Sequence, residues 1–128
     1  MPIEVVRGPD VPASHLPFSP AIKAGGFVFV SGQASVDAKT GDIISDTFES
    51  EFRRTMDNLQ RILATAGASL KQVVQVRSYV KDAKDVPEYN RLYREFFKEP
   101  YPARTTITNC LPPTLRYEIE VVAVKRQS

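Results

Sequence analysis

The chain has 128 residues, long enough for one domain with a single buried core. Hydrophobic residues make up 42% of it and charged residues 25%, values typical of globular proteins, which exclude the disordered and fibrous classes. Its 17 lysines and arginines exceed its 15 aspartates and glutamates by two, and this small excess does not indicate a nucleic acid partner.

A single cysteine and a single histidine narrow the possible chemistry. Cys110 can form no internal disulfide, which favours a reducing compartment, the cytosol. Together with His15 it cannot supply the four ligands of a structural zinc site, so we expect no metal. No apolar run approaches the roughly 20 residues of a membrane helix and no secretory leader pattern is found, so we expect a cytoplasmic protein without a membrane partner.

The first predicted elements are two strands. Residues 27–33, after a glycine pair at 25–26, are rich in β-branched and aromatic residues and predict a strand. Residues 37–41 have the composition of a turn, after which Ile43 and Ile44 could return to pair with that strand.

A long amphipathic helix is predicted next. Apolar residues recur at steps of three and four: Phe48, Phe52, Met56, Leu59, Ile62, Leu63 and Ala66. Asp46 with Glu49 resembles a capping pair at its start, and Gly67 stands where a left-handed C-terminal cap belongs.

The second half of the chain predicts one helix and three strands. Residues 74–81 alternate apolar and polar, as a strand with one buried face does. Asp85 with Glu88 opens a second helix, with an apolar stripe of Val86, Tyr89, Leu92, Tyr93, Phe96 and Phe97. Residues 103–109 and 115–124 predict the last two strands.

These elements predict a single α+β domain over residues 1–128, with two helices on one face of a sheet. The opposite face must then be polar or covered. Val122 and Val124 fall on the last strand, so burial of that face in an oligomer is one solution.

Charged residues on the last two strands form the first candidate site. Alternation places Arg104, Thr106 and Thr108 on one face of their strand. Glu118 and Glu120 share a face of the next strand, so pairing of the two strands would bring Arg104 close to Glu118. The arginine could then bind a carboxylate ligand through its planar guanidinium, or form an ordinary cross-strand ion pair. The pattern leaves both interpretations open.

Three further positions could line a ligand site. Ser31 precedes Gly32, which permits close approach of a ligand, although the pair could equally mark a bulge at a strand end. Asn90 lies within the second predicted helix, where an asparagine is often a plain surface residue. Phe18, in the proline-rich N-terminal arm, could cover a pocket or attach the arm to the core.

Taken in order, several segments resemble the reactive intermediate deaminase family, also called RidA/YjgF. The matching segments run from residue 17 to the last strand: Pro-Phe-Ser-Pro-Ala at 17–21, Phe-Val-Phe-Val-Ser-Gly-Gln at 27–33, Asn-Leu at 58–59 through Ala-Gly at 66–67, Val-Lys-Asp at 80–82, Tyr-Asn at 89–90, Phe-Phe at 96–97, Pro-Ala-Arg-Thr at 102–105, Leu-Pro at 111–112 and Glu-Ile-Glu at 118–120. No single segment is specific, and the ordered set carries the resemblance.

The resemblance implies a chorismate-mutase-like fold that assembles as a homotrimer, with a ligand cleft at each subunit interface. The implied activity is hydrolysis of reactive 2-enamine and 2-imine acids, such as 2-aminoacrylate, 2-iminopropanoate and 2-iminobutanoate, to 2-keto acids and ammonia. No cofactor or metal is implied. A protein that only binds or senses 2-keto acids is the alternative, as is a relative acting on 3-aminoacrylate or 2-aminomuconate. Ribonuclease activity, reported for some relatives, is harder to supply chemically without a pair of histidines.

Carried over by position, Arg104 would bind the substrate carboxylate, assisted by the backbone N–H of Thr106. Glu118 would activate the attacking water, and Ser31 and Asn90 would line the cleft with Phe18. Two positions depart from the family pattern: many members have tyrosine at the position of Phe18 and cysteine at that of Thr106.

Overall fold

The structure is a computed structural model that describes residues 2–12 and 14–125. In chain order its elements are β1 (Glu4–Val5), β2 (Ala21–Ala24), β3 (Phe27–Ala34), α1 (Phe48–Thr65), β4 (Val73–Val80), α2 (Val86–Phe96), β5 (Ala103–Thr108) and β6 (Tyr117–Val124). The α+β class expected from the sequence is confirmed. The single domain expected over residues 1–128 stays a prediction, and residues 1, 13 and 126–128 lie outside the described part.

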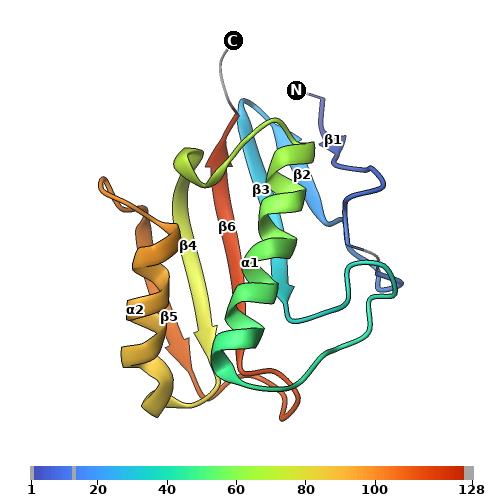
Figure 1. Ribbon diagram of the computed structural model, residues 1–128. Helices are drawn as coiled ribbons and strands as arrows, with labels where there is room; N and C mark the ends of the chain where they lie inside the picture. Colours follow the sequence, from blue (N-terminus) through green and yellow to red (C-terminus); the bar gives the residue numbers. More distant parts are fainter. Residues whose placement is uncertain (1, 13, 126–128) are drawn as a thin grey trace.

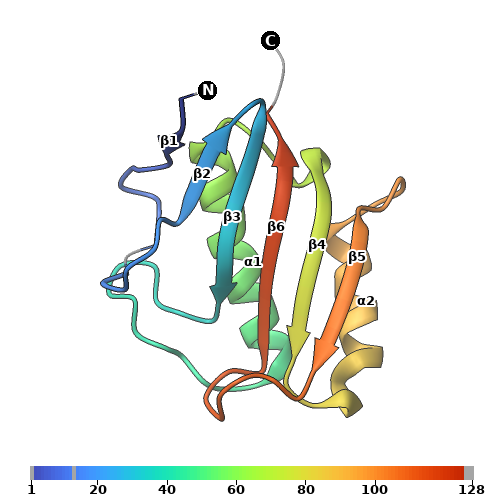
Figure 2. The same ribbon diagram turned by 180° about the vertical axis from the view of Figure 1, so that it is seen from behind.

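The strands form one mixed sheet in the order β1-β2-β3-β6-β4-β5. β6 lies at its centre, antiparallel to both β3 and β4, and β5 runs parallel to β4 along one edge. Both helices pack on the same face of this sheet (Figure 1). Seen from behind, the opposite face carries no helix (Figure 2). The expected arrangement of two helices on one face is therefore confirmed.

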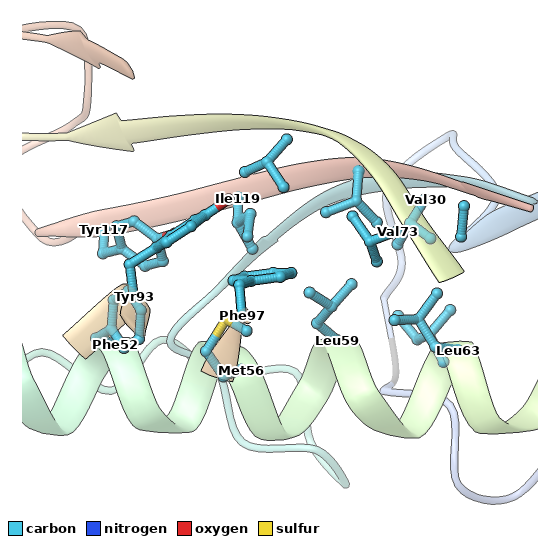
Figure 3. Close-up of a cluster of buried hydrophobic side chains, with 14 of the residues drawn as sticks. Val30, Phe52, Met56, Leu59, Leu63, Val73, Tyr93, Phe97, Tyr117 and Ile119 are labelled. Atoms are coloured by element: carbon cyan, nitrogen blue, oxygen red, sulfur yellow. The ribbon is translucent and has the colours of Figure 1, made fainter. Parts of the chain in front are cut away.

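Helix α1 supplies one side of the core. Its apolar stripe packs against the inward side chains of β3, β4 and β6, as Figure 3 shows for Phe52, Met56, Leu59, Leu63, Val30, Val73, Tyr117 and Ile119. Each large side chain of this kind stabilises the fold by about 1.5–3 kcal/mol when fully buried. This layer fixes the sheet on which the candidate site residues stand.

The start of α1 differs from the expectation. Thr47 is the N-cap, and its Oγ1 accepts a hydrogen bond from the Ser50 backbone N–H at 3.2 Å. The predicted capping pair of Asp46 and Glu49 is wrong, because the Asp46 carboxylate pairs instead with Arg54 at 3.0 Å. At the other end Gly67 has φ +83°, which confirms the left-handed cap expected there.

The partner of β3 also differs. Residues 43 and 44 form no strand; Ile43 makes only an isolated bridge with Val36. The antiparallel partner is β2, joined to β3 by Gly25 and Gly26 with φ +59° and +83°. A two-residue hairpin turn needs positive φ at both positions, which glycine adopts without strain. The N-terminal arm therefore contains two short strands that the sequence analysis did not predict.

The later boundaries are close to those expected. Asp85 is the N-cap of α2 but makes no side-chain capping bond, and Pro87 falls in the first turn, where proline is tolerated. β5 ends one residue early, before Asn109 with φ +64°.

Within residues 2–12 and 14–125, neither helix has the length and apolar character needed to span a bilayer.

Candidate active site

Arg104 stands on the edge strand β5 and turns toward the helices. It pairs in register with the buried Val76, so its side chain lies on the face that α2 covers. Its guanidinium carbon lies 5.0 Å from the ring centre of Tyr89 and 4.8 Å from that of Tyr93. Both rings are buried, and a guanidinium over an aromatic face is held by cation–π attraction. The two tyrosines thus fix the position of the charge.

The guanidinium keeps its hydrogen-bond donors available. In the described part of the chain, Arg104 forms no ion pair and no side-chain hydrogen bond. It borders a pocket of about 270 Å³ lined by Asn90, Tyr93, Arg94, Tyr101, Pro102 and Arg104. A guanidinium is a planar fork of N–H donors, so Arg104 at this pocket can donate hydrogen bonds to both oxygens of one carboxylate. Of the sequence candidates, Asn90 lines this pocket together with Arg104.

Thr106 lies on the same face of β5, two residues further along. Its hydroxyl donates a hydrogen bond to the Tyr89 hydroxyl oxygen at 3.3 Å. The side chain therefore contacts the same tyrosine that holds Arg104. The role expected of its backbone N–H stays a prediction.

A second pocket, of about 450 Å³, lies between the N-terminal arm, β3 and β6. Its lining includes the sequence candidates Phe18, Ser31 and Glu118, together with Pro12, Ser14, Leu16, Pro20, Gly32, Gln33, Ala34, Val36, Gly41, Ile43 and Leu115. The pocket is mostly apolar, and Glu118 is its one acidic side chain. Three of the predicted site residues are thus brought together here.

Ser31 attaches the arm to the sheet. Its hydroxyl donates to the Ser19 carbonyl oxygen at 2.6 Å, and its backbone N–H donates to the Pro20 carbonyl oxygen at 3.0 Å. The strand register shifts between Val30 and Gln33, so Ser31 also lies at a bulge. The bulge interpretation of Ser31 is therefore confirmed, and because Ser31 also lines the pocket, its contact with a ligand stays a prediction.

Glu118 lies against the backbone of β3, where the missing side chain of Gly32 leaves room for its carboxylate. Burial raises the pKa of the Glu118 carboxyl above its ordinary value, and the negative charge of Glu120 raises the pKa further. A carboxylate with a raised pKa is a stronger base than an ordinary one and is suited to accept a proton from water.

Arg104 and Glu118 do not meet within one chain, which corrects the expected pairing of their strands. β4 separates β5 from β6. Glu118 pairs with Tyr79 and so lies on the helix-free face, whereas Arg104 lies on the helix side. A cross-strand ion pair between Arg104 and a glutamate is therefore wrong for the described chain.

The helix-free face carries exposed apolar side chains. Phe27 and Phe29 are 42% and 45% exposed, and they pair with Val124 and Val122 of β6. Ile107 at the β5 edge is 38% exposed. Exposed apolar side chains of this kind are typical of a protein–protein interface.

Two residues that contact Arg104 were not among the site candidates of the sequence analysis. Tyr89 appeared there in the apolar stripe of α2 and in a segment of the family resemblance, and Tyr93 only in the stripe. Their helical spacing is the signal that places both rings toward β5. Three or more His, Cys, Asp or Glu side chains suited to a metal ion do not come together among the described residues.

The chain is similar in sequence and in structure to proteins of one family. The family model described as Endoribonuclease L-PSP matches residues 9–125. A RutC family protein of Pyrococcus horikoshii is 39% identical over 95% of this chain and 98% of its own length. A protein of Dermatophagoides farinae named 2-iminobutanoate/2-iminopropanoate deaminase is 30% identical over 96% of this chain and 97% of its own. The crystal structure of YyfA of Yersinia pestis, from the conserved Rid protein family, superposes with a TM-score of 0.89 at 28% identity, covering 96% of this chain and 99% of that one.

Proposed function

Because the chain belongs to the YjgF/RidA/RutC family, whose model is described as Endoribonuclease L-PSP, we propose that it hydrolyses reactive 2-enamine and 2-imine acids to 2-keto acids and ammonia. The simplest such substrate is 2-aminoacrylate with its imine tautomer. The name of the Dermatophagoides relative, a 2-iminobutanoate/2-iminopropanoate deaminase, supports this class.

The observation that carries the proposal is the presence of two complementary half-sites. One holds the Arg104 guanidinium, positioned over two tyrosines and bound to no carboxylate of the described chain. The other holds Glu118, whose pKa is raised. An anion anchor and a base are the two groups that hydrolysis of a small imino acid requires.

We propose that a homotrimer joins the half-sites. The Arg104 pocket of one subunit would lie against the Glu118 pocket of the next, with the exposed apolar side chains of the helix-free face buried at the centre. Phe27, Phe29 and Ile107 supply the apolar surface for that contact. A cyclic arrangement uses each edge of the subunit once and closes the ring.

In the proposed reaction Arg104 binds the substrate carboxylate and orients the C=N bond. Glu118 removes a proton from water as the water oxygen bonds to C2, and the C=N electron pair moves to nitrogen. The protonated Glu118 then returns its proton to that nitrogen, which gives a carbinolamine. Glu118 next takes the proton of the carbinol hydroxyl and passes it to the amino nitrogen. As the C–N bond breaks, its electron pair leaves with ammonia and the carbinol oxygen becomes the keto oxygen, so that one imine and one water give one keto acid and one ammonia.

The test is the release of ammonia from freshly generated 2-aminoacrylate, compared with the rate without protein. We expect the protein to accelerate release, Arg104→Ala to abolish both turnover and 2-keto acid binding, and Arg104→Lys to rescue poorly, because a point charge does not reproduce the fork. Glu118→Gln should lose turnover but retain keto acid binding. Unchanged rates in both variants would contradict the proposal.

The same assay separates the alternatives. Tight binding of 2-keto acids without accelerated ammonia release would indicate a binding or sensor protein. Ribonuclease activity, suggested by the family description, is tested by incubation with labelled RNA. The only histidine, His15, is exposed and lines neither pocket, which disfavours acid–base cleavage of RNA by that residue.

The assembly has its own test. Light scattering should give three times the 14.3 kDa mass of one chain, and a stable monomer would overturn the shared cleft. The cytosol is the proposed compartment, supported by the exposed free thiol of Cys110.

A further inference from the structure

The pocket beside Arg104 contains a second arginine. Arg94 of α2 lines the same pocket of about 270 Å³, and the other lining residues are Asn90, Tyr93, Tyr101 and Pro102. The lining therefore includes two guanidinium groups and no carboxylate. Like charges that share a small pocket repel each other unless an anion lies between them.

Neither arginine is neutralised by the described part of the chain. Arg94 forms no ion pair there, and its Nη1 donates only a long hydrogen bond, 3.4 Å, to the Asn90 carbonyl oxygen. That contact keeps the guanidinium beside a residue that itself lines the pocket. Two arginines of one pocket thus retain donors for an external anion.

The neighbouring Arg91 on α2, unlike Arg94, is paired with carboxylates. Its guanidinium contacts Glu88 at 3.5 Å, Glu95 at 3.6 Å and Glu49 of α1 at 3.8 Å. The acidic residues of α2 are therefore gathered on the side that faces α1, where Arg53 also contacts Glu95. Arg94 projects from the helix at a point where no carboxylate of residues 2–12 or 14–125 forms an ion pair with it.

We propose that the substrate carries a second carboxylate, which Arg94 binds while Arg104 binds the first; this inference rests on the proposed deaminase function. The substrate class is then a dicarboxylic 2-imino or 2-enamine acid, and the product a dicarboxylic 2-keto acid. A guanidinium fork matches a carboxylate in geometry and charge. The pocket volume lies just below the roughly 300 Å³ at which pockets for drug-sized ligands begin, which suits a small diacid.

A purely alkyl substrate side chain fits this pocket less well. It would lie against the Arg94 guanidinium and remove part of its hydration without offering an acceptor in return. A charged group left without a partner in this way lowers affinity. The second arginine therefore selects for an anionic side chain.

The test is calorimetric binding of product-like keto acids to the full chain. 2-Oxoglutarate and oxaloacetate represent the dicarboxylates, and 2-oxobutanoate represents the monocarboxylates. We expect the wild-type protein to bind 2-oxoglutarate at least tenfold more tightly than 2-oxobutanoate, and Arg94→Gln to lower this ratio about tenfold. Arg91→Gln, one turn away and outside the pocket, is the matched control and should leave the ratio unchanged.

The outcomes separate the inference from the function on which it rests. Equal binding of both acids by wild type, with an unchanged ratio in Arg94→Gln, would overturn the second carboxylate site and leave the deaminase proposal intact. Inorganic phosphate that competes as well as 2-oxoglutarate would show a general anion site and also overturn it. No binding of any keto acid would contradict the proposed function itself. Arg94→Lys, which keeps the charge, should retain more of the preference than Arg94→Gln.

Discussion

Glu51 and Arg116 form an ion pair in which the carboxylate is fully buried. Glu51 Oε2 lies 2.7 Å from the Arg116 guanidinium, and Oε1 accepts a hydrogen bond from the Arg116 backbone N–H at 2.9 Å. Oε2 also accepts from the Asp46 backbone N–H at 3.0 Å. One carboxylate therefore joins the start of α1 to the start of β6, two residues before Glu118.

We expect Glu51→Ala to lower the free energy of unfolding by about 3–5 kcal/mol, because three hydrogen bonds to one buried carboxylate, two from backbone N–H groups and one from the Arg116 guanidinium, are lost together. Glu49→Gln is the matched control on the same helix. Its carboxylate is half exposed and pairs with Arg53, so the change should stay within about 1 kcal/mol. Urea unfolding measures the free energy of unfolding of both variants. An equal decrease in the two would contradict the prediction that the buried Glu51 pair stabilises the fold more than the exposed Glu49 pair does.

Gly32→Ala tests the position of the Glu118 carboxylate. A Cβ at residue 32 would collide with Glu118 Oε2, the mobile end of its side chain. The carboxylate must then move while the fold is kept, so ammonia release should fall by roughly tenfold to a hundredfold. The free energy of unfolding should change by less than about 1 kcal/mol.

The control for this prediction is Gly8→Ala, whose Cβ would lie 3.3 Å from Thr65 Cγ2, outside both pockets. It should leave turnover unchanged. Full activity in a folded Gly32→Ala variant would mean that the observed position of Glu118 is not the one used in the reaction.

The pH dependence of turnover follows from the raised pKa of Glu118. The carboxylate must be deprotonated to act as a base, so the rate falls as the pH drops through the Glu118 pKa. Glu120 is one of the two causes of that raised pKa. We therefore expect Glu120→Gln to lower the Glu118 pKa and to move the acid limb of the pH–rate profile to lower pH.

The titration of Tyr79 does not contribute to the acid limb of this profile. Its hydroxyl donates to Glu120, and this bond raises the pKa of Tyr79 to about 12, so the phenol stays protonated over the acid limb. Glu95→Gln is the control, because it removes a carboxylate of α2 that pairs with Arg53, and it should leave the acid limb at the same pH. An acid limb that stays fixed or moves upward in Glu120→Gln would exclude Glu118 as the titrating group.

Most helices and strands of the fold could be predicted from local sequence patterns. The apolar spacing of Phe52, Met56 and Leu59 is a property of neighbouring residues, so it predicts α1 without reference to the rest of the chain. Strand order is not local. The pattern around Arg104 gave no sign that β4 would lie between β5 and β6.

The candidate site shows the same limit. Arg104, Glu118 and Ser31 were found through the resemblance and their chemistry, and the structure distributes them over two pockets on different faces. The tyrosines under Arg104 appeared as ordinary core residues, because helical spacing alone does not distinguish a ring that fills the core from one that also holds a charge.

The separation of Arg104 from Glu118 makes a subunit-mixing experiment decisive. If each site takes its arginine from one subunit and its glutamate from the next, Arg104→Ala and Glu118→Gln are each inactive alone. Refolded together in equal amounts, they form mixed trimers in which about a quarter of the sites have both residues intact. We therefore expect ammonia release to recover to about a quarter of the wild-type rate. The double variant, mixed with either single variant, is the control and should recover nothing, because no site then has both residues. Mixed trimers that stay inactive, with their composition verified by two different affinity tags, would show that Arg104 and Glu118 do not act from neighbouring subunits.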